Sequence, residues 1–135
     1  MPDSTKELAR RFLDRMNAGD LSAIDNLVSD DFVEHEEIPG LEPTKAGLRQ
    51  MFEMIHTGLQ DAKFEVDDLI AEGDTASARS RLTGTHRGEF MGIPATGRTI
   101  SVGVSDYLRF DNGLLVEHWG VMDTGALMQQ LTGGA

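Results

Sequence analysis

Cysteine is absent from this chain, and its absence removes several classes of chemistry at once. Disulfide bonds, thiolate metal sites and a cysteine nucleophile are all excluded. The sequence also lacks any apolar run that approaches the length of a membrane span, and residues 1–7 show neither the basic stretch nor the apolar core of a secretion signal. We therefore expect a cytoplasmic protein without a membrane partner.

Basic side chains are few. The 12 lysine and arginine residues stand against 23 aspartate and glutamate residues, which gives a formal net charge of -11. Such a charge repels nucleic acid backbones and anionic lipids, and no cluster of basic residues is dense enough to override it. We expect neither nucleic acid nor a membrane surface as a partner.

Recognisable cofactor motifs are missing as well. The chain has no phosphate-binding glycine loop, no nucleophile elbow and no pair of histidines at helical metal-ligand spacing. The glycine-rich segment 88–97 lies between two predicted strands rather than before a helix, so a phosphate-binding role is not expected. We interpret it as a loop at the rim of a pocket, where Phe90 and Met91 supply apolar contacts.

What is present is one domain, residues 1–135, with helices first and strands after. Capping residues begin a helix at Ser4, a short helix at Asp20 and a third helix at Thr44. Apolar alternation predicts strands over 31–36, 62–71, 75–86, 98–110 and 114–122, and a last helix over 124–131. This order indicates an α+β fold, in which the helices cover one face of a curved antiparallel sheet and leave a cone-shaped hollow.

A carboxylate on an apolar strand face is the clearest sign of chemistry. From Ile100 to Phe110 every second residue is apolar except Asp106, which therefore points toward the core. The next strand carries His118 on the face that we expect to be apolar. An acid and an imidazole on adjoining strands are within reach of each other when the register brings them together.

The loop between these two strands decides the register. A three-residue loop over 111–113 places Asp106 directly opposite His118. A two-residue loop of Asn112 and Gly113 instead turns the other face of the second strand toward Asp106. We favour the three-residue loop because it keeps apolar residues on the apolar face. Its pairs are Phe110 with Leu114, Leu108 with Val116, and Asp106 with His118.

The neighbouring strand 75–86 presents mostly small residues on one face, including Ala76, Ala78 and Ser80. Cores are normally filled to close packing, so small residues leave a hollow unless helix side chains fill it. A buried Asp–His pair can also be purely structural. Two interpretations stay open here: a catalytic pair in a cavity, or a structural pair in a filled core.

Several segments are together characteristic of one enzyme family. They are 83–94 (TGTHRGEFMGIP), 96–98 (TGR), 111–113 (DNG), 116–119 (VEHW) and 31–35 (DFVEH). In these segments the chain resembles the SnoaL-like polyketide cyclases, often called ester cyclases, over nearly its whole length. The resemblance implies the cone-shaped nuclear-transport-factor-2-like fold, a homodimer formed through the outer sheet face, and an active site inside the cone that needs no cofactor or metal.

In that family a carboxylate directly after a tryptophan drives an intramolecular aldol cyclisation, with histidine support. The resemblance makes His118 the histidine and Trp119 the tryptophan, but Gly120 occupies the carboxylate position. We therefore expect Asp106 and His118 to be the catalytic pair, with Asp106 as base and His118 as orienting group or acid. The reaction would be an aldol cyclisation or isomerisation of a small hydrophobic carbonyl compound. A noncatalytic small-molecule binding protein is the alternative, and Gly120 favours it.

Six further residues are candidates for substrate binding. His35 on the first strand and His86 at the end of another are expected near the mouth of the cone, and a solvated or structural role is an equal alternative for each. Trp119 alternates away from His118, so a core or dimer contact is favoured for it over substrate stacking. The set comprises His35, His86, Phe90, Met91, Phe52 and Trp119.

Overall fold

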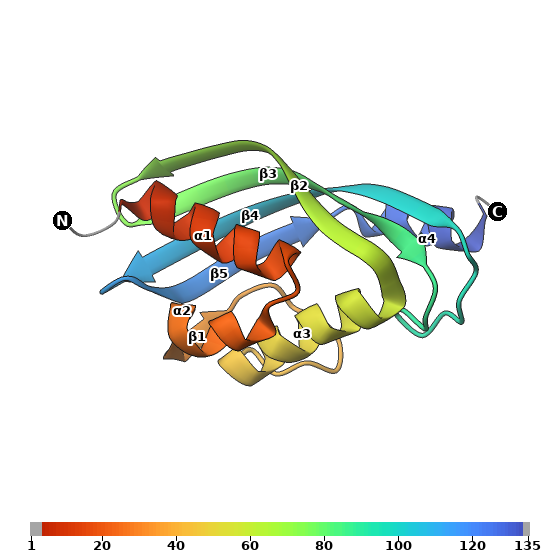
Figure 1. The fold of residues 1–135 in the computed structure, drawn as a ribbon, viewed down its shortest axis with the longest axis horizontal. Coiled ribbons are helices and arrows are strands. Elements are labelled where there is room, and N and C mark those ends of the chain that lie inside the picture. Colours follow the sequence, from red (N-terminus) through yellow and green to blue (C-terminus); the bar gives the residue numbers. More distant parts are fainter. Residues whose placement is uncertain (1–3, 134–135) are drawn as a thin grey trace.

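The computed structural model describes residues 4–133 and shows helices packed on one face of a curved sheet (Figure 1). The helices are α1 (Thr5–Asn17), η1 (Leu21–Ala23), α2 (Ile24–Leu27), α3 (Lys45–Gly58) and α4 (Thr124–Thr132). The strands are β1 (Val28–Glu34), β2 (Leu59–Glu72), β3 (Thr75–His86), β4 (Thr99–Asp111) and β5 (Leu114–Met122). The predicted α+β fold is confirmed, and the sheet remains open rather than closing into a barrel.

The strand order is β1-β5-β4-β3-β2. Strands β2 to β5 form the expected antiparallel series, while β1 joins the far edge parallel to β5. This parallel pairing sets Glu34 of β1 beside His118 of β5, across 84 residues of sequence. The Glu34-His35 and Glu117-His118 segments, which are far apart in the sequence, are therefore neighbours in the sheet.

Two of the predicted helix starts have their capping hydrogen bonds. The backbone N–H of Glu7 donates to Ser4 Oγ at 3.2 Å, and the Ser4 hydroxyl donates back to the Glu7 carboxylate. The N–H of Gly47 donates to Thr44 Oγ1 at the start of α3. The bonds from Glu7 N–H and Gly47 N–H each satisfy a backbone donor that the first helical turn leaves without a partner. These local signals position the two helices that cover the site.

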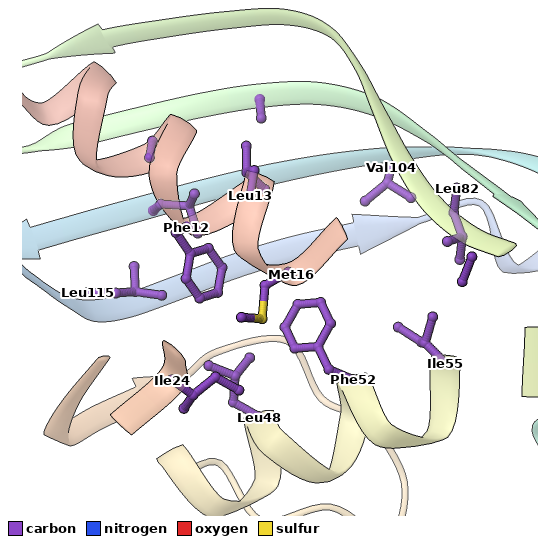
Figure 2. Packing of buried hydrophobic residues seen from close by; sticks show 14 of the residues in the cluster. Phe12, Leu13, Met16, Ile24, Leu48, Phe52, Ile55, Leu82, Val104 and Leu115 are labelled. Carbon is purple, nitrogen blue, oxygen red and sulfur yellow. The ribbon is translucent and has the colours of Figure 1, made fainter. Parts of the chain in front are cut away.

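Helices α1 and α3 share one apolar core with the inner face of the sheet (Figure 2). Phe12 and Met16 of α1 face Phe52 of α3, and the rings of Phe12 and Phe52 meet edge to face at 6.2 Å. Phe52 makes a second such contact with Phe64 of β2. Helix side chains therefore cover the inner face that small residues of β3 leave shallow. Within residues 4–133, no helix has the length and apolar character that crossing a bilayer requires.

The turn between β4 and β5 corrects the predicted register. Asp111 pairs with Leu114, so the loop consists of Asn112 and Gly113 alone, and their φ angles are 51° and 79°. Positive φ at both positions is what a two-residue type I′ hairpin requires, and Asn-Gly adopts it readily. The predicted three-residue loop was wrong.

A β-bulge follows the turn. The two-residue loop alone would turn His118 to the outer face, and the bulge turns it back to the inner face. Phe110 pairs with Leu115 but Arg109 pairs with Glu117, so Val116 is an extra residue in β5. An extra residue shifts the alternation by one, and His118 returns to the inner face. The three predicted pairs were wrong. The observed partners are Phe110 with Leu115, Leu108 with His118, and Asp106 with Gly120.

Candidate active site

Asp106 and His118 make the contact that the sequence suggested, by a different route. His118 Nε2 donates to Asp106 Oδ1 at 2.7 Å. The two residues are diagonal neighbours, because Asp106 is paired with Gly120 and His118 with Leu108. Gly120 has no side chain to stand between them, and His118 is buried with only 6% of its surface exposed. The contact is present, and its catalytic role stays a prediction.

Glu34 completes a triad that the sequence analysis missed. His118 Nδ1 donates to Glu34 Oε2 at 2.5 Å, and Glu34 is 8% exposed. Phe32 and Glu34 lie on the buried face of β1. The alternation that identified Asp106 was therefore also visible in the predicted strand 31–36. What was not visible was the parallel partner strand that brings His118 to Glu34.

Two carboxylates keep the imidazole charged. Burial on its own lowers the pKa of His118, but the hydrogen bonds to Asp106 and Glu34, with their negative charges, outweigh burial and raise that pKa to about 10. Both ring nitrogens therefore carry protons at neutral pH, and each donates to a carboxylate. The result is a buried imidazolium fixed on two sides.

Glu36 is a third carboxyl group at this site and was not among the predicted residues. Burial raises its pKa, as do the charges of Glu34 and Asp106, while the charge of His118 opposes the rise. Its backbone N–H donates to Glu34 Oε2 at 3.1 Å. A Cβ atom at position 120 would overlap with Glu36 Oε1 and lie 2.7 Å from His118 Cε1. Gly120 therefore leaves the space that the Glu36 carboxyl group occupies.

A small apolar cavity adjoins this cluster. Its volume is about 50 Å³, enough for a few water molecules but too small for an organic substrate. Among residues 4–133, the ionisable members of its lining are Glu36, Asp106 and His118. The apolar lining comes from the helices and the sheet and includes Phe12, Leu48, Met51, Phe52, Phe64, Val104, Leu108 and Met122.

A larger cleft lies outside the cavity, between β1, the following loop and α3. Its volume is about 500 Å³. Glu36, Leu48 and Met51 line both the cleft and the cavity, so they form the wall between them. A molecule in the cleft would meet Glu36 before it reached His118.

His35 and Trp119 lie on the other face of the sheet. Their rings stack at 4.5 Å with an angle of 9° between the planes, and His35 Nε2 is 2.8 Å from Glu117 Oε2. Trp119 is 40% exposed. His35 also borders the outer cleft. The structure does not bring these two side chains together with Asp106, and substrate binding by them stays a prediction.

The other predicted binding residues divide between cavity and loop. Phe52 lines the apolar cavity. His86 is fully buried, and its ring nitrogens contact Thr96 Oγ1 and the carbonyl oxygen of Ile93, both in the glycine-rich segment. Phe90 is buried, whereas Met91 is exposed. His86, Phe90 and Met91 line neither the cavity nor the cleft, so the predicted rim loop lies elsewhere.

One cluster in the described part of the chain has donor atoms spaced for a metal ion. Glu34, Glu36 and His118 each offer one ligand atom, and these atoms lie within 4.8 Å of one another. His118 would have to release a proton and its bond to Glu34 before Nδ1 could bind a cation. A pKa of about 10 makes that exchange costly near neutral pH.

The family model and the similar solved structures both relate this chain to the SnoaL-like polyketide cyclases. The family model described as SnoaL-like polyketide cyclase matches residues 6–131. TsrD from Streptomyces laurentii is 33% identical with a TM-score of 0.83, over 96% of this chain and 94% of TsrD. AclR from Streptomyces galilaeus, a candidate hydroxylase, is 32% identical with a TM-score of 0.82, over 96% of this chain and 81% of AclR.

IdmH from Streptomyces antibioticus, a candidate polyketide cyclase, is 27% identical with a TM-score of 0.83, over 96% of this chain and 99% of IdmH. Among curated proteins, no sequence matches this chain.

Proposed function

Because the chain belongs to the SnoaL-like polyketide cyclase family, we propose that it is a cofactor-independent acid/base enzyme. Its reaction is an aldol cyclisation or an isomerisation of a small hydrophobic carbonyl or polyketide-like substrate. The fold is that of the nuclear-transport-factor-2-like superfamily. The observation that carries the proposal is the buried imidazolium of His118, fixed by Asp106 and Glu34 at the edge of an apolar cavity.

This arrangement suits proton removal next to a carbonyl group. The C–H bond breaks, the proton passes to a carboxylate, and the electron pair moves onto the carbonyl oxygen. Both N–H groups of His118 donate to carboxylates, so its fixed positive charge acts through space. It offsets the carboxylate charges that would oppose the developing negative charge, and it needs no reorganisation during the reaction. The proton then returns to another atom, or the carbanion attacks a second carbonyl carbon and closes a ring.

Two carboxylates line the cavity and qualify as the base, Asp106 and Glu36. Asp106 is the one that the sequence indicated. His118 orients the cluster and stabilises negative charge, and its pKa of about 10 argues against release of its own proton in each turnover. We therefore favour the orienting role for His118 over the acid role.

The first test is Asp106→Asn, which keeps the shape of the side chain and removes its charge. We expect deuterium uptake from heavy water at the carbon next to the carbonyl of hydrophobic aryl ketones to fall by about 100-fold or more. Binding of the same ketones, followed by thermal shift, should persist. Asp14→Asn on the exposed side of α1 is the matched control. Unchanged exchange in Asp106→Asn would contradict the proposal.

A noncatalytic small-molecule binding protein is the second candidate, and Gly120 is the observation that favours it. In that case the wild-type protein binds hydrophobic ketones but does not accelerate exchange, and Asp106→Asn alters affinity alone. Wild-type exchange above the rate in buffer would decide against this candidate.

The proposal includes the homodimer that the resemblance implies. Tyr107, Trp119 and Val121 are exposed on the outer face of β4 and β5. Association through this face would cover them. Light scattering after size-exclusion chromatography should give twice the monomer mass, and Val121→Arg should shift it toward the monomer. A wild-type monomer at all concentrations would contradict this part of the proposal.

A further inference from the structure

The carboxylates of Asp106 and Glu34 are both committed to His118. Each accepts one of the two ring N–H groups, at 2.7 Å and 2.5 Å. Protonating either carboxylate would replace a charge-assisted hydrogen bond with a weaker one inside a buried site. A proton from the substrate would therefore reach Asp106 only at the expense of the contact that fixes the imidazolium.

The Glu36 carboxylate, in contrast, makes no hydrogen bond to His118. Within residues 4–133, no side chain or backbone group donates a hydrogen bond to its carboxylate; the bond near it runs from its own N–H to Glu34. The charged groups that face it are His118 from β5, Glu34 from β1 and Asp106 from β4, while Leu48 and Met51 of α3 are apolar. Its oxygens are free to accept a proton.

Glu36 also lies where it can contact both a substrate and His118. It borders the outer cleft and the inner cavity at once, so a molecule in either space can contact it. Its carboxyl group lies over Gly120, in the volume that a side chain at that position would take. His118 Cε1 borders the same volume. A group here can touch both a substrate and the charged ring.

We propose that Glu36 is the catalytic residue that exchanges the proton with the substrate, in the space left open by Gly120, and that Asp106 and Glu34 are positioning residues that act through His118. This inference rests on the proposed acid/base function and specifies which group performs it. The raised pKa of Glu36 agrees with the role, because a base is most effective when its pKa approaches the working pH.

The test uses an activated probe, 5-nitrobenzisoxazole. A base removes the proton from its ring carbon, the N–O bond breaks, and a cyanonitrophenolate forms; the carboxyl group then returns the proton to water. Glu36→Gln should lower the protein-dependent rate by about 100-fold or more, as loss of a general base does. Glu53→Gln on the exposed side of α3 should leave the rate unchanged.

A crossed pair of variants separates catalysis from packing. Glu36→Ala removes the carboxyl group from the space above Gly120. Gly120→Asp then returns a carboxylate to that space from β5, with His118 Cε1 at 2.7 Å as the remaining close neighbour of the new Cβ. Glu36→Ala alone should be inactive, and Glu36→Ala with Gly120→Asp should regain at least about 10-fold, because a carboxylate again lies beside His118. A purely structural role for Glu36 predicts no such rescue.

The pH profile gives a further readout. The wild-type rate should rise with pH as Glu36 ionises, with a midpoint above the ordinary value of 4.5 for a glutamate. Glu36→Gln should lose this rise. Full activity in Glu36→Gln, together with an inactive Asp106→Asn, would overturn the inference and leave the proposed function intact. A wild-type protein that does not accelerate the probe at all would overturn both.

Discussion

Two Glu-His sequences face each other across the parallel strands β1 and β5, and they form two different pairs. Glu34 meets His118 on the inner face, while His35 meets Glu117 on the outer face. The contacts are 2.5 Å and 2.8 Å long, so distance barely separates them. The inner pair is buried beside a cavity, whereas the outer pair is partly exposed and lies next to Arg109 and Trp119.

The two pairs have the same residue types, so the difference between them comes from burial and from the neighbouring charges. On the inner face, two carboxylates share one imidazole, and the pKa of His118 rises to about 10 in spite of burial. On the outer face, Glu117 is partly exposed, and hydrogen bonds from His35 and then from Arg109 lower its pKa. Only the inner pair combines a fixed charge with an adjoining apolar cavity.

Removing the histidine from each pair should give the largest contrast. His118→Leu leaves Asp106 and Glu34 buried without a positive partner, so we expect a loss of about 3–5 kcal/mol in the free energy of unfolding. His35→Leu breaks a surface pair and should cost no more than about 0.5–1 kcal/mol. Urea denaturation of both variants measures the difference, and equal losses would refute it.

Stability should also depend on pH through the inner pair. The folded pKa of His118 lies above its ordinary value of 6.5, so its contribution is fully present below about pH 6.5 and disappears as pH rises through about 10. The free energy of unfolding should therefore decline over this range in the wild type. The decline should be smaller in His118→Leu. Parallel curves for the two proteins would mean that another group is responsible.

Gly120→Ala tests how closely the inner carboxyl group occupies its space. The new Cβ would overlap with Glu36 Oε1, so we expect a loss of about 1–3 kcal/mol on denaturation. Adding Glu36→Ala should recover part of it, because the 2.7 Å contact between the new Cβ and His118 Cε1 remains. Gly103→Ala on β4 is the control, since a Cβ there has no neighbour within 4 Å. Equal effects at Gly120 and Gly103 would show that the space is not filled as described.

The smallest expected effect belongs to Glu117→Gln on the outer face. The carboxylate is partly exposed, so its ion pairs with Arg109 and His35 are screened by water and salt. We expect a smaller change in the free energy of unfolding than for any of the variants above, and a still smaller one in high salt. A change as large as that of Gly120→Ala would remove the distinction between the two faces.

Much of the fold was readable from local pattern, and the errors are informative. The capping signals at Ser4 and Thr44 and the alternation of β3 and β5 gave elements that the structure confirms. The predicted three-residue turn was wrong because the apolar alternation of the sequence does not reveal that Val116 is an extra residue in β5. A two-residue loop followed by a bulge places His118 on the same face as the expected three-residue loop.

The site was only half visible for a similar reason. Asp106 and His118 lie on adjoining strands 12 residues apart, a separation at which hairpin pairing can be inferred. Glu34 and Glu36 reach the same place through the parallel pairing of β1 with β5, across more than eighty positions. Glu34 alternates with Phe32 on the buried face of β1, but the alternation does not identify the partner strand.

Side-chain periodicity and capping chemistry act over a few residues, so the chain's own pattern was sufficient for the helices, most of the strands and the inward direction of Asp106. Strand order, the bulge and the placing of Glu36 over Gly120 were settled only by the folded molecule. These features depend on which segments, distant in sequence, pack together in the fold. A one-residue shift in strand register would leave the local sequence pattern unchanged but give each side chain different neighbours.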